Sequence, residues 1–346
     1  MTWPFPPPIK PMLARAKETP PQPPGWVYEP KWDGFRAIVW SGDQPGNQLR
    51  IDSRTGKDLL RYFPELVSAV EQLPAGTVVD AEIVVVIDDV TEFEVLQQRI
   101  HPAASRVNML AEQTPAEMVV FDVLAVDGED VRPEPQHQRR RRLEGLGDTL
   151  GNPWHLTPLT DDLAVATEWF TEYEAAGCDG IIAKAADGAY IENKRDWIKW
   201  KHRREADCVV GGYRVHKDGD KIGSILLGLF DDTGSFHFVG HCSGFSDHNR
   251  VELLARFEAL RTDASFGGDD MARVPGAQSR WSTGKELEWV PVEPGVVVQV
   301  GYDQLEGNRF RHATRFERWR PDKPAAECTL DQLERPEGAG FTDVVG

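Results

Sequence analysis

Residues 28–36 read Tyr28-Glu29-Pro30-Lys31-Trp32-Asp33-Gly34-Phe35-Arg36. Lys31 stands beside an Asp-Gly pair, which is typical of a strand that ends at a tight turn. A lysine amine at such a place can act as a nucleophile toward phosphorus. At typical residue frequencies, the K-x-D-G pattern also occurs by chance in about one chain in ten of this size. The rest of the sequence must decide between a reactive lysine and an ordinary hairpin.

The composition indicates a globular protein with room for two domains. The chain has 346 residues, of which 40% are hydrophobic and 27% charged. The four cysteines have no C-x-x-C spacing, so neither a disulfide framework nor a zinc site is expected. No run of eighteen apolar residues and no signal peptide are present, so we expect a cytoplasmic protein without a membrane partner.

The charge distribution favours a nucleic-acid partner although the net charge is -17. Phosphate backbones are bound largely through Lys and Arg. Residues 194–204 carry six Lys/Arg against one Asp, and residues 309–323 are basic with interleaved aromatic side chains. A third run, Arg139 to Arg142, lies at the start of a predicted helix. For that run, a solvated helix face and a DNA contact remain equally open.

The hydrophobic pattern predicts an α+β first domain over residues 26–204, with antiparallel sheets, preceded by a Pro-rich lead-in over residues 1–25 that packs on it. Residues 26–40 read as strand, turn and strand. Further strands are predicted at 78–87, 118–126 and 181–183, and helices at 65–73, 136–146 and 162–176.

The sequence pattern of residues 205–346 is typical of a small β-barrel. Strands are predicted at 208–213, 224–230, 236–241, 296–301 and 312–319, with one helix at 249–260. Five strands and a helix suit a Greek-key barrel of the OB type, which is a common nucleic-acid platform. Residues 262–285 are expected to form a mobile loop.

Seven short motifs follow one another along the chain: KWDGFR at 31–36, SRTG at 53–56, DAEIV at 80–84, VFD at 120–122, DGIIAK at 179–184, WIKWK at 197–201 and RPDK at 320–323. In this order they resemble the ATP-dependent DNA ligases, and most closely bacterial DNA ligase C and the ligase domain of bacterial ligase D. PMLA at 11–14 and RWSTGK at 280–285 add to the resemblance.

The resemblance implies a nucleotidyltransferase (adenylation) domain followed by an OB-fold domain. It implies an enzyme that seals nicks between a 5′-phosphate and a 3′-hydroxyl through a lysyl-AMP on Lys31, using ATP and Mg²⁺ or Mn²⁺. The expected partners are nicked double-stranded DNA and a repair polymerase or an end-binding protein. We expect a monomer in the bacterial cytoplasm, at the nucleoid, that serves DNA repair, with recombination and replication as related processes.

The resemblance also assigns catalytic roles. Lysine is protonated at neutral pH, so Lys31 requires a lowered pKa, for which Lys199, Lys201 and the metal ion would supply the positive charge. Lys199 and Lys201 are two residues apart and would face one side of a strand, where a solvated basic face is the alternative. Arg320 and Lys323 are expected to orient pyrophosphate when the barrel closes.

Further residues are expected to bind the nucleotide, the metal ion or DNA. Phe121 would stack on adenine, with core packing as the alternative. Glu82 and Asp179 would contact the ribose or the metal ion, with ordinary edge carboxylates as the alternative. The remaining nucleotide residues are Glu29 near the adenine amino group, Pro30, Arg36 near the ribose and Arg54 near phosphate. The expected phosphate contacts of DNA are Arg54, Lys194, Arg195, Arg203, Arg204, Arg309 and Arg311.

Two positions depart from the family pattern. Ala81 stands where many relatives carry glycine, and Asp179 stands where larger ligases often carry glutamate. Because aspartate is one methylene shorter, its contact with the metal ion, direct or through water, remains open. Three other functions also remain open: a GTP-dependent capping guanylyltransferase, an RNA ligase, and a non-catalytic OB-fold protein that binds nucleic acid.

Overall fold

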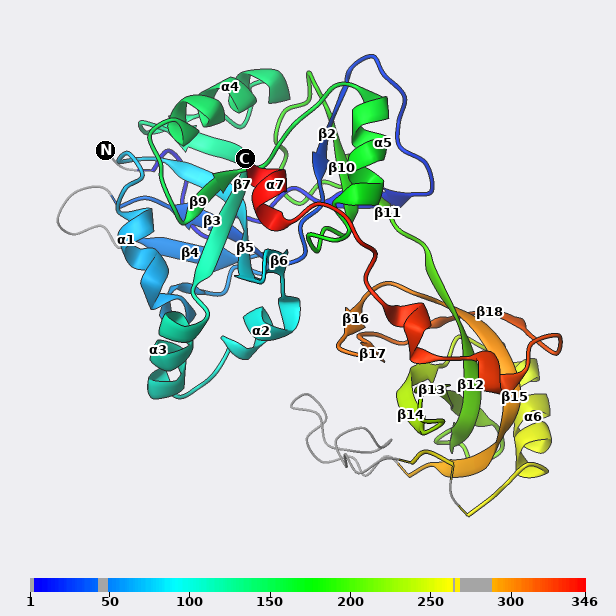
Figure 1. Cartoon of the computed structure of the whole chain (residues 1–346). Coiled ribbons are helices and arrows are strands. Elements are labelled where there is room, and N and C mark those ends of the chain that lie inside the picture. The colour runs from blue at the N-terminus through cyan, green and yellow to red at the C-terminus, as the bar shows by residue number, and fades with distance from the viewer. Residues whose placement is uncertain (1–2, 43–48, 264, 268–287) are drawn as a thin grey trace. The chain divides into compact units, whose positions relative to one another are not determined.

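A computed structural model describes residues 3–42, 49–263, 265–267 and 288–346. The chain forms two compact units (Figure 1). The first consists of Met1–His202 together with Arg335–Gly346, and the second consists of Arg203–Glu334. The division lies two residues from the predicted one at 204/205. Residues 335–346 were expected in the second domain, but they belong to the first unit. The RWSTGK motif and most of the predicted loop at 262–285 lie outside the described residues.

The first unit contains a seven-stranded sheet in which β4, β3, β5, β7 and β8 follow one another, β6 pairs with β5, and β9 pairs with β7. The strands are β3 (Phe35–Trp40), β4 (Arg50–Ser53), β5 (Val78–Ile87), β6 (Val90–Thr91), β7 (Ala116–Val126), β8 (Glu129–Asp130) and β9 (Trp154–Leu156). All pairs are antiparallel except β7 with β9.

A second sheet of four strands has the order β1-β11-β10-β2. It consists of β1 (Ala14–Lys17), β2 (Trp26–Pro30), β10 (Gly180–Ala185) and β11 (Trp197–Lys201). Strand β1 pairs with β11 in parallel, so the predicted lead-in contributes a strand to the fold. Side chains from this lead-in, including Phe5, Ile9 and Met12, are buried with residues of both sheets.

The predicted hairpin over residues 26–40 is wrong in its pairing. Both strands exist, but β2 pairs with β10 in the smaller sheet, whereas β3 pairs with β4 and β5 in the larger one. The residues between them, including Lys31, therefore cross from one sheet to the other.

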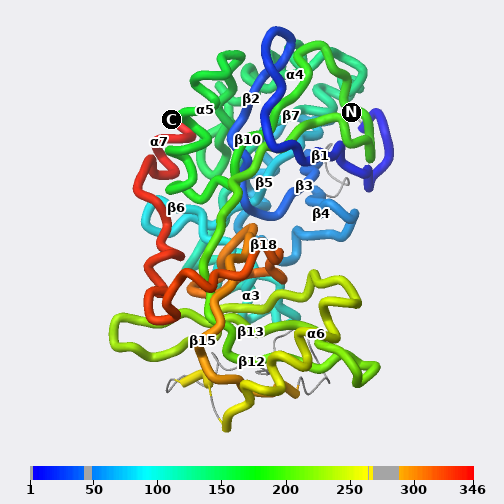
Figure 2. The backbone as a smooth tube through the Cα atoms, turned by 90° about the vertical axis from the view of Figure 1, so that its right-hand side faces the viewer, coloured from blue at the N-terminus to red at the C-terminus, as the bar shows by residue number. Residues whose placement is uncertain are grey.

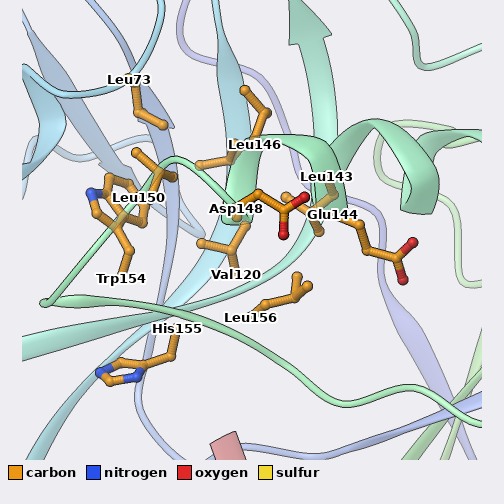
Figure 3. A pocket seen from close by; sticks show the side chains of 12 residues that line it. Leu73, Val120, Leu143, Glu144, Leu146, Asp148, Leu150, Trp154, His155 and Leu156 are labelled. Atoms are coloured by element: carbon orange, nitrogen blue, oxygen red, sulfur yellow. The ribbon is translucent and has the colours of Figure 1, made fainter. Parts of the chain in front are cut away.

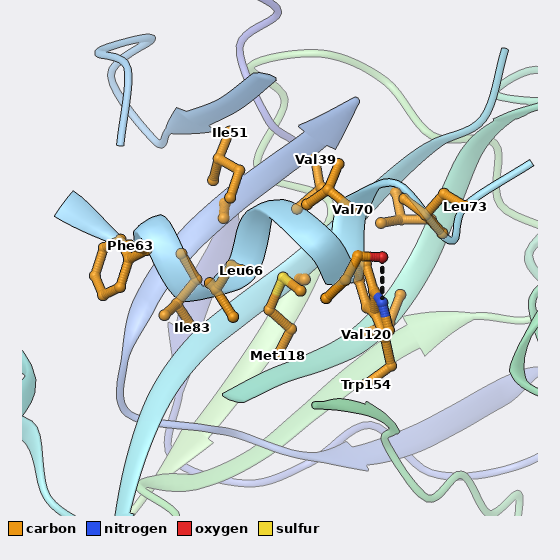
Figure 4. Packing of buried hydrophobic residues seen from close by; sticks show 14 of the residues in the cluster. Val39, Ile51, Phe63, Leu66, Val70, Leu73, Ile83, Met118, Val120 and Trp154 are labelled. Carbon is orange, nitrogen blue, oxygen red and sulfur yellow. Dashed lines mark hydrogen bonds between the residues drawn. The ribbon is translucent and has the colours of Figure 1, made fainter. Parts of the chain in front are cut away.

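The two faces of the larger sheet bury different clusters, as strand alternation requires. Ala37 and Val39 of β3 belong to a core that also contains Phe63, Leu66 and Trp154 (Figure 4), whereas Ile38 and Trp40 pack with the cluster that includes Trp197 of the smaller sheet. The indole of Trp154 donates to the Ala69 carbonyl at 2.9 Å. The inner face of the larger sheet thus lies against the smaller sheet.

The helices of the first unit lie around these sheets (Figures 1 and 2). They are α1 (Val67–Val70), α2 (Phe93–Gln98), α3 (Ala104–Gln113), α4 (Gln136–Gly147), α5 (Leu163–Glu172) and α7 (Phe341–Val345). The predicted helix at 65–73 is only α1, because 3-10 turns at Leu60–Tyr62 and Pro64–Leu66 precede it. Helix α5 is shorter than predicted, and the Asp162 side chain caps it.

The second unit is built on a five-stranded sheet of order β14-β13-β12-β15-β18. Its elements are β12 (Arg204–Val215), β13 (Ile222–Phe230), β14 (Phe236–Cys242), α6 (Asp247–Glu258), β15 (Val290–Tyr302) and β18 (Arg315–Trp319), with a small hairpin of β16 (Leu305–Glu306) and β17 (Arg309–Phe310). Register shifts interrupt several pairs, such as β12 with β15, and a bulge of this kind bends a sheet. The predicted antiparallel strands are confirmed, and α6 confirms the predicted helix among the residues of this unit that the structure describes.

Among the residues that the structure describes, no helix is long and apolar enough to span a bilayer.

Candidate active site

Lys31 is fixed where the chain crosses between the sheets. Its backbone N–H donates to the Gly180 carbonyl at 2.8 Å, and its carbonyl accepts from the Asp179 N–H at 2.7 Å. Three residues on, the chain passes so close to β5 that a Cβ on Gly34 would lie 2.2 Å from the Ile83 carbonyl oxygen. Only glycine fits there without displacing the strand.

The Lys31 amine forms an ion pair with a buried carboxylate. Its Nζ lies 2.8 Å from Asp179 Oδ2, and Lys201 Nζ lies 3.0 Å from the same oxygen. Burial lowers the pKa of Lys31, but Asp179, Asp33 and Glu82 outweigh it, so the pKa is raised. The expectation of a lowered pKa is therefore wrong for the chain without its substrates, because three carboxylates surround the amine.

Lys199 extends the positive charge around this pair. It pairs with Ile182 across β10 and β11, two residues before Lys201. Burial lowers its pKa, and so do the charges of Lys201, Lys31 and Arg54. The exposed Arg54 thus faces the same region as the three lysines. Lys199 and Lys201 were expected to supply positive charge around Lys31, and both act in that region, with Arg54 adding to the charge at Lys199.

Glu82 lies on β5 beside the crossing segment and is half-buried. Its Oε1 accepts from the Gly34 N–H at 3.2 Å. Burial is the largest influence on this carboxyl and raises its pKa to about 8, against the lowering effect of Lys31 and Arg36. A carboxyl in this state is ready to lose a proton when a cation binds.

A buried lysine in β10, Lys184, holds the next part of the site, although its motif predicted no role for it. Lys184 Nζ lies 2.7 Å from Glu29 Oε2 and donates to the Phe121 carbonyl at 2.7 Å. The amine also lies 5.1 Å from the centre of the Phe121 ring and 4.5 Å from that of Trp197. Glu29, expected near the adenine amino group, thus forms a buried ion pair with Lys184. The signal was a single lysine in the apolar strand 180–185.

Arg36 is anchored on the same inner face. It forms a bidentate pair with Asp80, with N–O distances of 2.9 and 2.6 Å, and Tyr190 donates to the same carboxylate at 2.7 Å. Its guanidinium lies 5.3 Å from the centre of the Phe121 ring and 4.9 Å from that of Trp197. Phe121, half-buried, is therefore flanked by two cations and an aromatic ring. Pro30 ends β2 opposite Ile181, beside Glu29.

The run Arg139 to Arg142 lies on α4. As a whole it forms neither the solvated helix face nor the DNA contact that the sequence left open. Arg139 is buried and pairs with Asp122 of the VFD motif at 2.8 Å. Arg140 pairs with Glu144, and Arg142 pairs with Glu134, whereas Arg141 is exposed. Helix α4 therefore braces the strand that carries Phe121.

The carboxyl groups of the site can bind a divalent cation only if other ligands complete its coordination shell. Asp179 Oδ1 is buried without a hydrogen-bond partner, so it can accept a bond from a ligand or from a water on a metal ion. Within the described part of the chain, no three His, Cys, Asp or Glu side chains are grouped for a metal ion. Mg²⁺ commonly takes one or two carboxylates, with water and substrate phosphates completing the shell, and Glu82 and Asp179 fit that pattern.

The expected residues of the last motif lie in the second unit. Arg320 pairs with Asp207 at 2.8 Å and with Asp322 at 2.9 Å, and Lys323 lies 3.4 Å from Asp207. The first unit therefore holds the Lys31 cluster without them.

The cations expected to bind DNA are divided between the units. Lys194, which pairs with Asp196 at 2.6 Å, and Arg195 are exposed in the first unit. Arg203 and Arg204 begin the second unit, where Arg204 donates to the Asp303 carbonyl at 2.9 Å. Arg309 lies 4.8 Å from the centre of the Phe238 ring, and Arg311 donates to Gln304 at 2.6 Å.

A separate cavity of about 260 Å³ lies beside α4 (Figure 3). Its walls are mainly apolar and include Val120, Leu143, Leu146 and Leu156. Val120 packs in the core on one face of the larger sheet, whereas Phe121 packs with the cluster on its inner face. The cavity is therefore distinct from the Lys31 site.

The sequence models of known families match both units. Residues 11–201 match the ATP dependent DNA ligase domain, and residues 218–323 match the ATP dependent DNA ligase C terminal region. The chain belongs to the ATP-dependent DNA ligases. The ligase is 47% identical to DNA ligase C1 of Mycolicibacterium smegmatis, with 100% of this chain and 99% of the relative covered.

Two further comparisons concern the family and the fold. It is 31% identical to the multifunctional non-homologous end joining protein LigD of Pseudomonas aeruginosa, over 97% of this chain and 38% of that protein. A solved structure of the Lig E DNA ligases shares the fold, with a TM-score of 0.54, 15% identity, and coverage of 89% of this chain and 99% of that one. The predicted fold class, with its adenylation and OB-fold domains, and the predicted use of ATP are confirmed. The matches favour a DNA ligase over a capping enzyme or a non-catalytic OB-fold protein.

Proposed function

We propose that the ligase seals nicks in DNA through a covalent AMP on Lys31. The observation that carries the proposal is the fixed position of the Lys31 amine, which is bound to Asp179 and lies beside Lys199 and Lys201. In the first step, Lys31 Nζ would form a bond to the α-phosphorus of ATP while the bond to pyrophosphate breaks. The AMP would then pass to a 5′-phosphate, and a 3′-hydroxyl would displace it.

The three lysines would have different tasks in this chemistry. Lys31 is held as an ammonium by its carboxylate neighbours, so it must lose a proton before it attacks. Lys199, whose pKa is lowered, and Lys201 would stabilise the charge that develops on the α-phosphate. Arg320 and Lys323 would orient the leaving pyrophosphate from the second unit.

The inner face of the larger sheet offers a place for the nucleoside. The base would stack on Phe121, and the Glu29–Lys184 pair beside Pro30 would present polar groups to its edge. Arg36, fixed by Asp80, would contact the ribose, and Arg54 would contact phosphate or the DNA end. A bidentate pair holds Arg36 in one geometry, which favours orientation of the ligand.

Glu82 and Asp179 would hold a divalent metal ion, Mg²⁺ or Mn²⁺, that supplies positive charge to the phosphates. Two ammonium groups already share Oδ2 of Asp179, so the unpartnered Oδ1 is the oxygen that Asp179 would offer to the ion. Glu82 would bind it after losing a proton.

Covalent labelling and nick sealing test the proposal. The wild-type protein should acquire labelled AMP from ATP, none should form with labelled GTP, and Lys31→Ala should abolish both labelling and sealing. Lys217→Ala, at an exposed position in the second unit, serves as the control and should behave as wild type. Nick sealing that survives Lys31→Ala would contradict the proposal. Nicks with RNA on either side would reveal an RNA-joining activity.

We further propose that DNA is bound mainly through its phosphates, in a repair role that the likeness to LigD supports. The cations proposed for this contact are Arg54, Lys194, Arg195, Arg203, Arg204, Arg309 and Arg311. Affinity for a nicked duplex should then fall steeply with salt, and Arg54→Ala should reduce the slope of log K against log salt by about 1. A salt-independent affinity would refute phosphate-dominated binding. An end-binding protein or a repair polymerase would direct the ligase to its substrate.

A further inference from the structure

The last residues of the chain return to the first unit after the second unit is complete. Arg335 pairs with Glu92 at 3.2 Å, and the Ala339 N–H donates to the Glu172 carbonyl at the end of α5 at 3.2 Å. Helix α7 follows, shown in red against the first unit in Figure 1. The segment 335–346, which we call the tail, is thus fastened at several points.

Asp89 fixes the start of α7. Its carbonyl accepts from the Phe341 N–H at 2.6 Å, and its carboxylate accepts from the Thr342 N–H at 2.8 Å and from the Thr342 hydroxyl at 3.0 Å. A Cβ on Gly340 would lie 1.8 Å from Asp89 Oδ2, so any larger residue at 340 would displace the Asp89 carboxylate that holds Thr342. Both contacts set the direction in which the Phe341 side chain enters the protein.

The apolar side of the tail is buried behind the catalytic motif. Phe341 and Val344 are 1% and 4% exposed, and they share a cluster with Trp32, Cys178 and Val84. The rings of Phe341 and Trp32 meet edge to face with centroids 5.5 Å apart. Burial of a ring and an aromatic contact of this kind stabilise the packed position.

The two side chains that Phe341 supports are neighbours of the reacting pair. Trp32 follows Lys31, and Cys178 precedes Asp179. On its polar side, the Trp32 indole donates to the Thr157 hydroxyl at 3.0 Å. Trp32 is therefore fixed by a hydrogen bond and by the Phe341 ring, while its backbone leads directly to Lys31.

We propose that Phe341 is a positioning residue for the Lys31 amine. It acts through Trp32 and Cys178 to keep the Lys31 amine and the Asp179 carboxylate at fixed positions relative to each other. It touches neither the nucleotide nor the reacting atoms. The inference rests on the proposed lysyl-AMP chemistry. Loss of the ring would let the Lys31 segment shift, and a displacement of about 1 Å at a reacting group can cost about 100-fold in rate.

Separate measurement of the chemical steps distinguishes positioning from general stability. The rate of Lys31–AMP formation at saturating ATP is measured in a single turnover, and sealing of a nick that already carries AMP on its 5′-phosphate is measured beside it. The second reaction does not use the Lys31 nucleophile. For Phe341→Ala, AMP formation should fall by about 100-fold, while sealing of the adenylated nick remains near the wild-type rate.

Matched variants complete the experiment. Phe341→Leu keeps an apolar side chain and should recover most of the rate, and Glu337→Ala, at an exposed position of the tail, should match wild type. If Phe341→Ala does not fold, Phe341→Leu and Val344→Ala carry the test, with a smaller loss expected in AMP formation alone. Equal loss of both reactions, or no loss in either, would overturn the inference. A wild-type protein that forms no lysyl-AMP would overturn the proposed function, and the inference with it.

Discussion

The charge of the Lys31 amine is set by its carboxylate neighbours, chiefly Asp179. The sequence predicted that the positive charges of Lys199, Lys201 and a metal ion lower the pKa of Lys31. In the structure, Lys201 is bound to the same carboxylate and Lys199 bears the lowered pKa. The amine is therefore held in place as an ammonium. In the proposed mechanism, nucleotide and metal ion would have to change its surroundings before it could attack.

Asp179→Asn tests this account of the amine. The change removes the largest of the influences that raise the pKa of Lys31, so that pKa should fall. The rate of AMP formation should then reach its plateau at a lower pH, even though the plateau itself is reduced. Single-turnover rates between pH 6 and 10 give the profile, with the exposed Asp161→Asn as the control. An unshifted profile would mean that Asp179 does not govern the proton on Lys31.

Glu82 should make the stability of the first unit depend on pH. Its pKa rises from 4.5 to about 8 on folding, so between these values the folded chain binds one more proton than the unfolded chain. The contribution is complete below pH 4.5 and is lost as the pH rises through about 8. Its slope is up to about 1.4 kcal/mol per pH unit.

Glu82→Gln should remove this part of the pH dependence and leave the variant relatively more stable above pH 7. Unfolding of both proteins between pH 5.5 and 9 provides the comparison. Parallel stability curves for the two proteins would show that Glu82 is ionised throughout.

At the scale of elements, helix α4 supports β7, the strand that carries Phe121, through one buried arginine. Arg139 pairs with Asp122 and also donates to Gln136 at 2.6 Å and to the Gly188 carbonyl at 3.0 Å. Removing Arg139 would leave the buried Asp122 carboxylate with only the Lys184 amine, 3.9 Å away, to offset its charge. Arg139→Ala should therefore destabilise the first unit by about 3–5 kcal/mol.

The same run of arginines supplies the control for that prediction. Arg141 is exposed on the same helix, so Arg141→Ala should change the free energy of unfolding by less than about 0.5 kcal/mol. Thermal and denaturant unfolding of both variants measures the difference. If the two substitutions cost the same, the Arg139–Asp122 pair does not brace β7.

The sequence predicted those strands and helices whose pattern lies within one short segment. Strands β5 and β7 were found because their apolar, β-branched residues are continuous, and α4 was found within one residue. The sequence wrongly paired β2 with β3, because an Asp-Gly turn also suits a hairpin. The true partner of β2, β10, lies about 150 residues away. The buried Lys184 was missed for a related reason, since its partner Glu29 is distant in the sequence.

At the scale of the whole molecule, the chain leaves the first unit after His202 and returns at Arg335. The second unit is therefore an insertion with two connections, where the sequence predicted a terminal domain with one. The motifs identified the family because each is short and local. The tail carries no such motif, and its link to Trp32 is visible only in three dimensions.

The central claim is that Lys31 carries the AMP that activates a DNA 5′ end. The most direct test is peptide mass spectrometry of the ligase after incubation with ATP and Mg²⁺, followed by a chase with nicked DNA. The account predicts one AMP on the peptide that contains Lys31, its loss during the chase, and its absence from Lys31→Ala. An AMP on another residue, or one that remains on the protein while nicks are sealed, would contradict it.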